Sequence, residues 1–148
     1  MPIPLFPILL AVGAGASIVV QQFLNANLRN ALNSAAWSGF ASYFVGLLCM
    51  TILAAVLRDP LPSAAEAARI PWWAWSGGLF GATFIGLAIF LVPELGGATF
   101  FALLVTGQMF ASVTLDHFGW LGVAERPIDL PRLAGVALLI AGVVLIRR

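Results

Sequence analysis

The feature that most constrains the fold of this chain is a series of five long apolar segments, separated by shorter stretches that hold most of the charged residues. A bilayer core about 30 Å thick requires about 20 mostly apolar residues per helix. Of the 148 residues, 61% are hydrophobic and 9% are charged, and the mean hydropathy is +1.04. Soluble domains do not have this composition. The sequence therefore predicts an all-α membrane protein with a single membrane domain over residues 1–148 and helices at about 4–25, 35–57, 71–92, 98–117 and 132–146.

Prolines, a capping residue and tryptophans mark the expected helix ends. Pro4 and Pro7 suit the first turns of a helix, where a missing N–H donor costs little. Ser34 is the expected N-cap of the second helix, and the sequence RDPLP ends that helix. The third helix begins at PWW, which is typical of a membrane interface, and we expect it to end at PELGG, residues 93–97. The N-terminal residues carry no Arg or Lys before the first helix, which favours a retained span over a cleaved signal peptide.

The arginines are balanced between the two sides of the predicted bundle. Five spans place the termini on opposite sides, and the side richer in Lys and Arg normally faces the cytoplasm. A difference of one arginine favours insertion in both orientations, so we expect an antiparallel, dual-topology dimer of ten helices. One fixed orientation with a weak bias is the alternative. The N-terminal side holds Arg58, Arg69, Arg126 and Arg132, and the other side holds Arg29, Arg147 and Arg148.

One face of the first helix is polar. Small and polar side chains recur there at every fourth position and therefore share a face. An amide that faced lipid would have no hydrogen-bond partner, so we expect this face to point toward the protein interior. The residues that follow are expected to leave the membrane for water. The interior face comprises Gly13, Ser17, Gln21 and Asn25, and the exit comprises Asn27, Arg29 and Asn30.

The fourth helix carries the deepest strongly polar side chain. Gln108 lies about 17 Å along a crossing of about 30 Å. An interhelical hydrogen bond explains Gln108 as well as a cavity-lining role does. For the second role we expect Gln108, Ser112 and Thr106 to line a solute pocket. Tyr43 would form an aromatic wall, and Gln21 and Asn25 would act as gate or helix-partner contacts.

The acidic residues lie away from the middle of every predicted span. Asp116 and His117 end the fourth helix, where they are candidate proton-linked residues, but helix termination and interface anchoring explain the pair equally well. The chain has one cysteine and one histidine, and no glycine-rich loop that ends in lysine. We therefore expect no enzyme activity, no cofactor, no metal and no nucleic-acid partner.

Four segments carry a resemblance to a known family: QQFLNANLRNAL, WWAWSGGLFGA, TGQMFASVTLDHFGWLG and RLAGVALLIAGVVLI. They resemble the YdcZ-like family of bacterial inner-membrane proteins in the drug/metabolite transporter superfamily, over nearly the whole chain. That family is similar to one five-helix half of the EamA-type transporters, and the resemblance implies a chain that works as a pair. The family pattern falls on Gln21, Asn25, Ala26, Trp73, Gly77, Gly107, Gln108, Asp116, His117, Gly119, Gly135 and Gly142.

The residues and the resemblance together predict a small multi-pass transporter of the bacterial inner membrane. Small multidrug exporters of the same superfamily place a glutamate in the middle of their first helix, whereas this chain has Gly13 to Ser17 at that depth. We therefore expect a small organic or amphipathic solute, moved by alternating access across the dimer. The expected partners are membrane lipid and an inverted copy or a paralogous half. The alternative is a non-transporting membrane component that binds or moves lipid or supports a partner protein.

Overall fold

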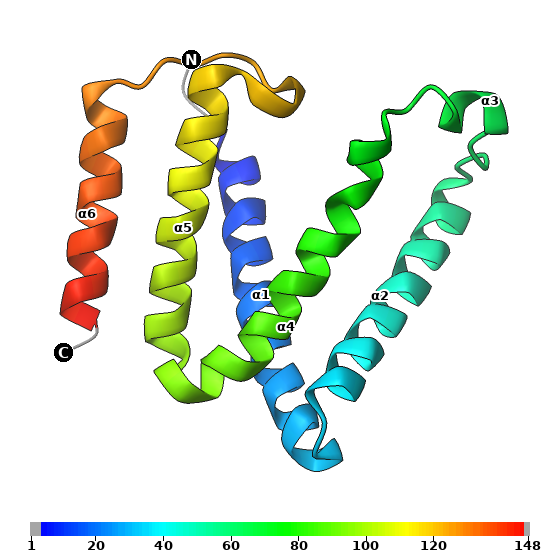
Figure 1. Ribbon diagram of the computed structural model, residues 1–148, viewed down its shortest axis with the longest axis horizontal. Coiled ribbons are helices and arrows are strands. Elements are labelled where there is room, and N and C mark those ends of the chain that lie inside the picture. Colours follow the sequence, from blue (N-terminus) through cyan, green and yellow to red (C-terminus); the bar gives the residue numbers. More distant parts are fainter. Residues whose placement is uncertain (1–3, 147–148) are drawn as a thin grey trace. The chain divides into compact units, whose positions relative to one another are not determined.

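The computed structural model describes residues 4–146. All regular secondary structure in this part of the chain is helical, and the helices are joined by turns and loops (Figure 1). Among these residues, four helical segments are long and apolar enough to cross a membrane, and α6 is apolar but shorter at 17 residues. The structure thus confirms the helical class and four of the expected spans by length and composition. The elements are α1 (Leu5–Leu32), α2 (Ala35–Leu57), α3 (Ala64–Ala67), η1 (Trp72–Ser76), α4 (Gly77–Leu95), α5 (Gly97–Phe118), η2 (Trp120–Gly122) and α6 (Leu130–Ile146).

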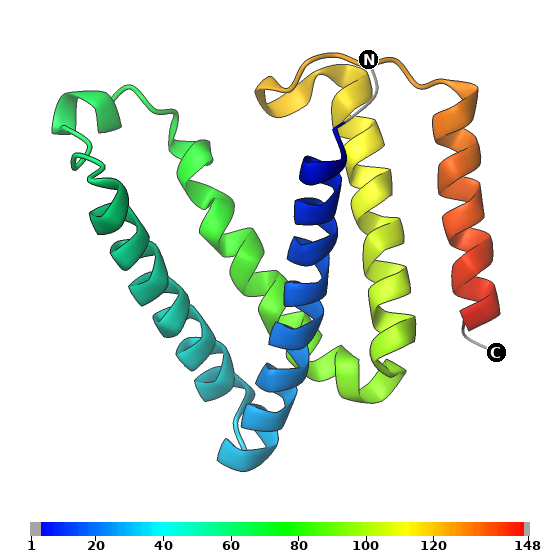
Figure 2. The same cartoon turned by 180° about the vertical axis from the view of Figure 1, so that it is seen from behind.

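The chain divides after Pro93 into two compact units. In the N-terminal unit α1 packs against α2, and α4 completes the helical part (Figure 2). In the C-terminal unit α5 packs against α6, and η2 lies in the connection between them. Each unit is described by itself below.

The first helix is longer than predicted. Its expected end near residue 25 is wrong, because α1 continues to Leu32 and stops at Asn33, whose φ of 50° is left-handed. The Ser34 side chain then accepts a hydrogen bond from the N–H of Trp37 and caps α2, as predicted. Side chains become more polar after residue 25, but polarity alone does not end a helix, because amides and arginine are compatible with helical backbone.

The predicted break at residues 93–97 is also misplaced. α4 runs through Pro93 to Leu95, and the turn is made at Gly96, whose φ is +78°. Glycine adopts this conformation without the steric cost that a side chain brings. Pro93 therefore lies inside the helix, where it lacks the N–H that would bond the carbonyl four residues earlier.

The polar connection between α2 and η1 contains a short helix that the sequence analysis missed. The Ser63 hydroxyl accepts from the Glu66 N–H, and the Glu66 carboxylate accepts from the backbone N–H and the hydroxyl of Ser63. These two hydrogen bonds lower the pKa of Glu66. The spacing S-x-x-E is a capping-box signal, so the sequence did hold the information needed to predict α3.

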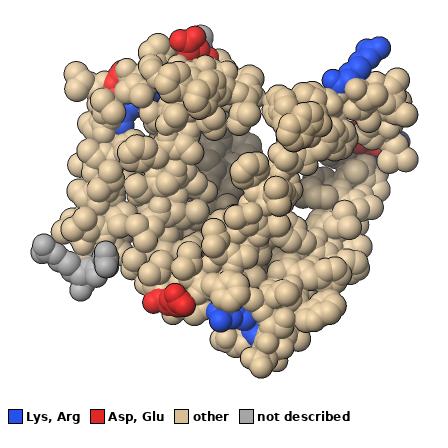
Figure 3. Space-filling view, viewed as in Figure 1, with Lys and Arg blue, Asp and Glu red and all other residues tan. Residues whose placement is uncertain are grey.

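Most large apolar side chains are exposed, as expected for helices that lipid surrounds. On the face shown in Figure 3, the charged side chains lie near the ends of the helices and the broad middle carries none. The buried positions are few and include polar ones. Buried apolar residues are Ala26, Ile85, Ala88, Ile89, Val92, Phe100 and Val136, and buried polar residues are Gln22, Asn25 and Ser38.

Candidate functional site

The crossing of α1 and α2 is close and polar. Ser38 of α2 is fully buried, and its hydroxyl donates a hydrogen bond of 2.7 Å to the carbonyl oxygen of Asn25. The adjacent Gly39 faces α4, since a Cβ placed there would lie 3.7 Å from Cδ1 of Ile89. Small residues at this point let the helix backbones approach.

A groove of about 440 Å³ follows this crossing between α1 and α2, and we call it the α1–α2 groove. Gln21 and Ser42 meet in it, with Nε2 of Gln21 donating to Oγ of Ser42 over 3.3 Å. The structure thus brings Gln21 and Asn25, two of the predicted site residues, into one hollow. The lining residues are Ser17, Val20, Gln21, Leu24, Asn25, Leu28, Ala41, Ser42, Val45 and Gly46.

The most deeply buried amide is one that the sequence analysis did not select. Gln22 is 0% exposed, and neither Nε2 nor Oε1 has a hydrogen-bond partner among the described residues. Asn25 is 5% exposed, and its Nδ2 likewise has no partner in this part of the chain. An unpaired buried polar group costs about 1–3 kcal/mol, so a pair of such amides is an expensive feature in an apolar protein.

The buried face of α1 is rotated from the predicted one. Four-residue steps drift around a helix of 3.6 residues per turn, and the face that is buried follows the spacing i, i+3, i+4, i+7. This face holds Gln22, Asn25, Ala26 and the half-buried Arg29, whereas Gly13 and Ser17 are exposed. The i, i+3, i+4, i+7 spacing was the sequence signal that would have identified Gln22.

Arg29 does not leave the protein for water, which corrects the prediction. Its Nη1 donates to the carbonyl oxygen of Ile89 over 3.0 Å, and its guanidinium carbon lies 4.9 Å from the ring centre of Phe90. Both contacts are made to α4. A second hollow of about 370 Å³ adjoins Arg29, and its lining residues are Arg29, Asn30, Asn33, Ser34, Ala35 and Phe90.

Tyr43 contacts α4 and does not line the α1–α2 groove. A Cβ placed on Gly81 would lie 2.9 Å from the Tyr43 hydroxyl oxygen, so the absence of a side chain at Gly81 makes room for the phenol. The role of Tyr43 as an aromatic wall of a solute pocket stays a prediction.

The three predicted pocket residues of α5 line neither hollow. Thr106 is half-buried, and its hydroxyl donates to the carbonyl of Ala102 one turn earlier. Gln108 and Ser112 are exposed in the single chain. Their place in a solute pocket stays a prediction and requires a covering surface.

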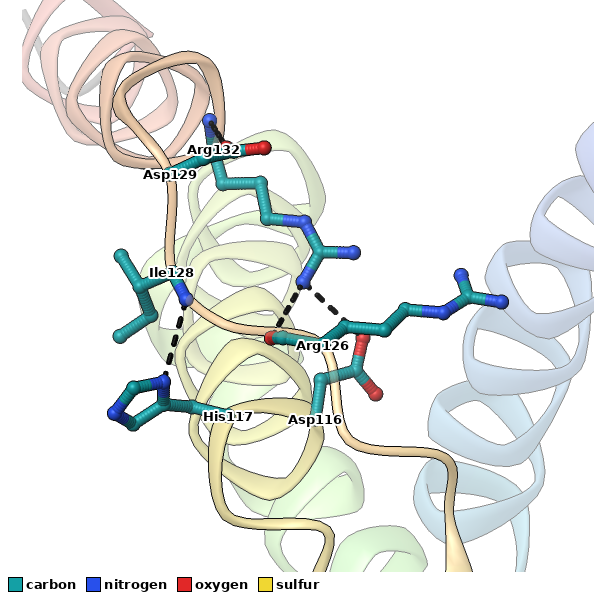
Figure 4. Close-up of polar contacts among 6 residues, drawn as sticks. All are labelled: Asp116, His117, Arg126, Ile128, Asp129 and Arg132. Atoms are coloured by element: carbon teal, nitrogen blue, oxygen red, sulfur yellow. Dashed lines mark hydrogen bonds and ion pairs between the residues drawn. The ribbon is translucent and has the colours of Figure 1, made fainter.

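Asp116 and His117 fasten the connection that follows α5. Oδ2 of Asp116 lies 3.6 Å from Nη1 of Arg132 (Figure 4). The N–H of Arg126 donates to the backbone carbonyl of Asp116. The N–H of Ile128 donates to Nδ1 of His117 over 3.3 Å. These contacts suit the anchoring alternative, and a proton-linked role stays a prediction.

The apolar outer surface and the buried amides define a small multi-pass helical membrane protein. Its sequence matches a family model over residues 6–145, and the chain belongs to that family, which is described as "Putative inner membrane exporter, YdcZ". It is similar to inner membrane protein YdcZ of Escherichia coli strain K12, with 26% identity over 137 residues, which cover 93% of this chain and 91% of that protein. No solved structure matches the chain.

These comparisons confirm the family resemblance, the location in the inner membrane and the assignment to a transporter family rather than an enzyme family. The family description names no substrate.

Proposed function

We propose that this chain is one half of a small exporter that moves a small organic or amphipathic solute by alternating access. The α1–α2 groove carries the proposal, because it gathers amides and hydroxyls in a chain whose other membrane surfaces are largely apolar. Its volume of about 440 Å³ falls within the range of about 300–1,000 Å³ typical of small-molecule sites.

The lining of the groove indicates the class of solute. Ten residues line it, and none of them carries a charge. Gln21, Asn25 and Ser42 offer hydrogen bonds, while leucine and valine side chains offer apolar contact. This combination favours a neutral, zwitterionic or amphipathic compound, whose polar group the amides orient.

The second half of the exporter is proposed to be an inverted copy of the same chain. The arginine balance of four against three supports it, given that α6 serves as a fifth crossing. An inverted partner would cover Gln108 and Ser112, which are exposed in the single chain. A paralogous chain in the same role is the other candidate partner.

Removing one groove hydroxyl tests the proposed site. In proteoliposomes, a panel of neutral and zwitterionic amphiphiles should include solutes with saturable, stereoselective transport. Ser42→Ala is expected to raise the half-saturation concentration about fivefold, because one hydrogen bond worth about 1 kcal/mol is lost. Dimerisation and Tm should remain as in the unmodified protein.

Thr51→Val is the matched control, since Thr51 also lies on α2, outside the groove lining, and its hydroxyl bonds its own helix at Leu47. It should leave transport unchanged. Equal effects of both substitutions would contradict the site. Movement of lipid without any solute selectivity would instead support the lipid-handling alternative.

A further inference from the structure

The carbonyl group of Ile89 lies where α4 lacks a hydrogen bond. In an α-helix the N–H of residue i bonds the carbonyl of residue i−4, and the partner of the Ile89 carbonyl would be the N–H of residue 93. Residue 93 is proline and has no N–H, and its ring crowds the same carbonyl. A carbonyl left unpaired in an apolar surrounding is costly.

Arg29 supplies the donor that Pro93 lacks. Its Nη1 lies 3.0 Å from the Ile89 oxygen, and its guanidinium lies over the ring of Phe90, the next residue of α4. No carboxylate of the described residues forms an ion pair with Arg29. The half-buried guanidinium is therefore held by two contacts, both with α4: one charge-assisted hydrogen bond and one cation–π contact.

We propose that Arg29 and Pro93 form a releasable joint, in which Arg29 is the positioning residue that keeps α4 helical across its proline. While the guanidinium bonds the Ile89 carbonyl, the last turn of α4 is held. When the guanidinium leaves, the Ile89 carbonyl has no donor and α4 bends more easily at Pro93, because the proline has already removed one hydrogen bond of the helix there.

The place of this joint in the chain gives it a role in transport. The two compact units divide after Pro93, so the joint lies in the segment that links them. Alternating access requires one part of a transporter to move against another. This last step rests on the proposed function, whereas the joint itself does not.

Hydrogen exchange of the α4 amides tests the joint without any solute. In purified protein, Arg29→Gln is expected to speed exchange in a peptide covering residues 90–95 at least tenfold, because the shorter, uncharged side chain no longer holds the Ile89 carbonyl. Arg69→Gln, which removes an exposed arginine from the connection before η1, should leave exchange unchanged.

The decisive variant is Pro93→Ala, which restores the missing N–H. Exchange in the Arg29→Gln, Pro93→Ala double variant should return to within about twofold of the unmodified protein. A structural role of Arg29 unrelated to the proline would leave the double variant as fast as Arg29→Gln. That result, or an Arg29→Gln variant with unchanged exchange, would overturn the proposal. If Arg29→Gln does not fold, Arg29→Lys replaces it, with a smaller increase that Pro93→Ala also abolishes.

The role in transport has a separate readout. Pro93→Ala alone should protect the 90–95 amides while lowering the turnover of a transported solute at least fivefold, with its half-saturation concentration unchanged. Unchanged turnover would refute the role in transport. The hydrogen-exchange result would still decide whether Arg29 and Pro93 form the joint. Absence of any transported solute for the unmodified protein would count against the proposed function alone.

Discussion

Replacing Gln22 with leucine is expected to stabilise the protein by about 1–3 kcal/mol, the cost of burying polar atoms without partners. Gln22 is 0% exposed, and both polar atoms of its side chain lack a partner among the described residues. Leucine is similar in size and has no polar atom to desolvate, so it removes the cost without leaving a large cavity. Thermal unfolding of the purified protein in detergent should show the gain as a raised Tm.

The same substitution is expected to impair transport, because an expensive buried amide that stability does not require indicates a function. Gln21→Leu, on the neighbouring residue, is the matched control for the gain in Tm. Gln21 lines the α1–α2 groove and bonds Ser42, so its replacement should change Tm little and weaken solute binding. A lower Tm for Gln22→Leu would show that the amide has a partner in the assembled protein and would contradict this account.

Ser38→Leu is expected to have the largest destabilising effect, about 2–4 kcal/mol. The Ser38 side chain is fully buried where α1 crosses α2, and its hydroxyl bonds the Asn25 carbonyl. Leucine adds bulk to a closed contact, which costs about 1–3 kcal/mol, and it also leaves the carbonyl without this donor. Denaturation followed by far-ultraviolet circular dichroism would measure the loss.

Gly39→Ala is the control for this crossing. A Cβ on Gly39 would lie 3.7 Å and 3.8 Å from side-chain atoms of Ile89 and Ile85, which is ordinary van der Waals contact. Alanine also has a helix propensity about 1 kcal/mol better than glycine. Gly39→Ala should therefore leave stability unchanged or raise it. Equal destabilisation by Ser38→Leu and Gly39→Ala would contradict this account, because it would mean that the α2 surface at Gly39 has no room even for a methyl group.

Local sequence signals predict a helix boundary well where a side chain at that boundary caps the helix. Ser34 caps α2 through its own side chain, and the predicted range 35–57 matches the structure. The end of α1 was misplaced because the prediction relied on polarity, which reports the surroundings of a helix. The prediction places a break at PELGG, but a proline inside a helix is tolerated when another donor serves the freed carbonyl, as Arg29 does for Ile89.

The candidate site was predictable only in part. Gln21 and Asn25 were identified from their spacing, and both line the α1–α2 groove. A strict four-residue repeat does not include Gln22, whereas the helical period of 3.6 residues does. The contact between Arg29 and Ile89 joins residues 60 positions apart, and no local pattern encodes it. Gln108 and Ser112 line neither hollow, and their proposed role in a pocket depends on a second chain, which a single sequence does not position.

The orientation of the chain in the membrane tests the central claim that the exporter works as an inverted pair. Fusions at the C-terminus to alkaline phosphatase, active only outside the cytoplasm, and to green fluorescent protein, fluorescent only inside it, report the two orientations. The arginine balance predicts comparable signals from both fusions. Ala65→Arg with Ala68→Arg makes the count six against three and should fix one orientation. Arg58→Gln, Arg69→Gln and Arg126→Gln together make it one against three and should favour the other.

Each set of substitutions expressed alone should then lose transport, and the two variants expressed together should regain it, since only together do they supply both orientations. Signal from one fusion alone in the unmodified protein, with transport retained by a variant of fixed orientation, would contradict the inverted pair.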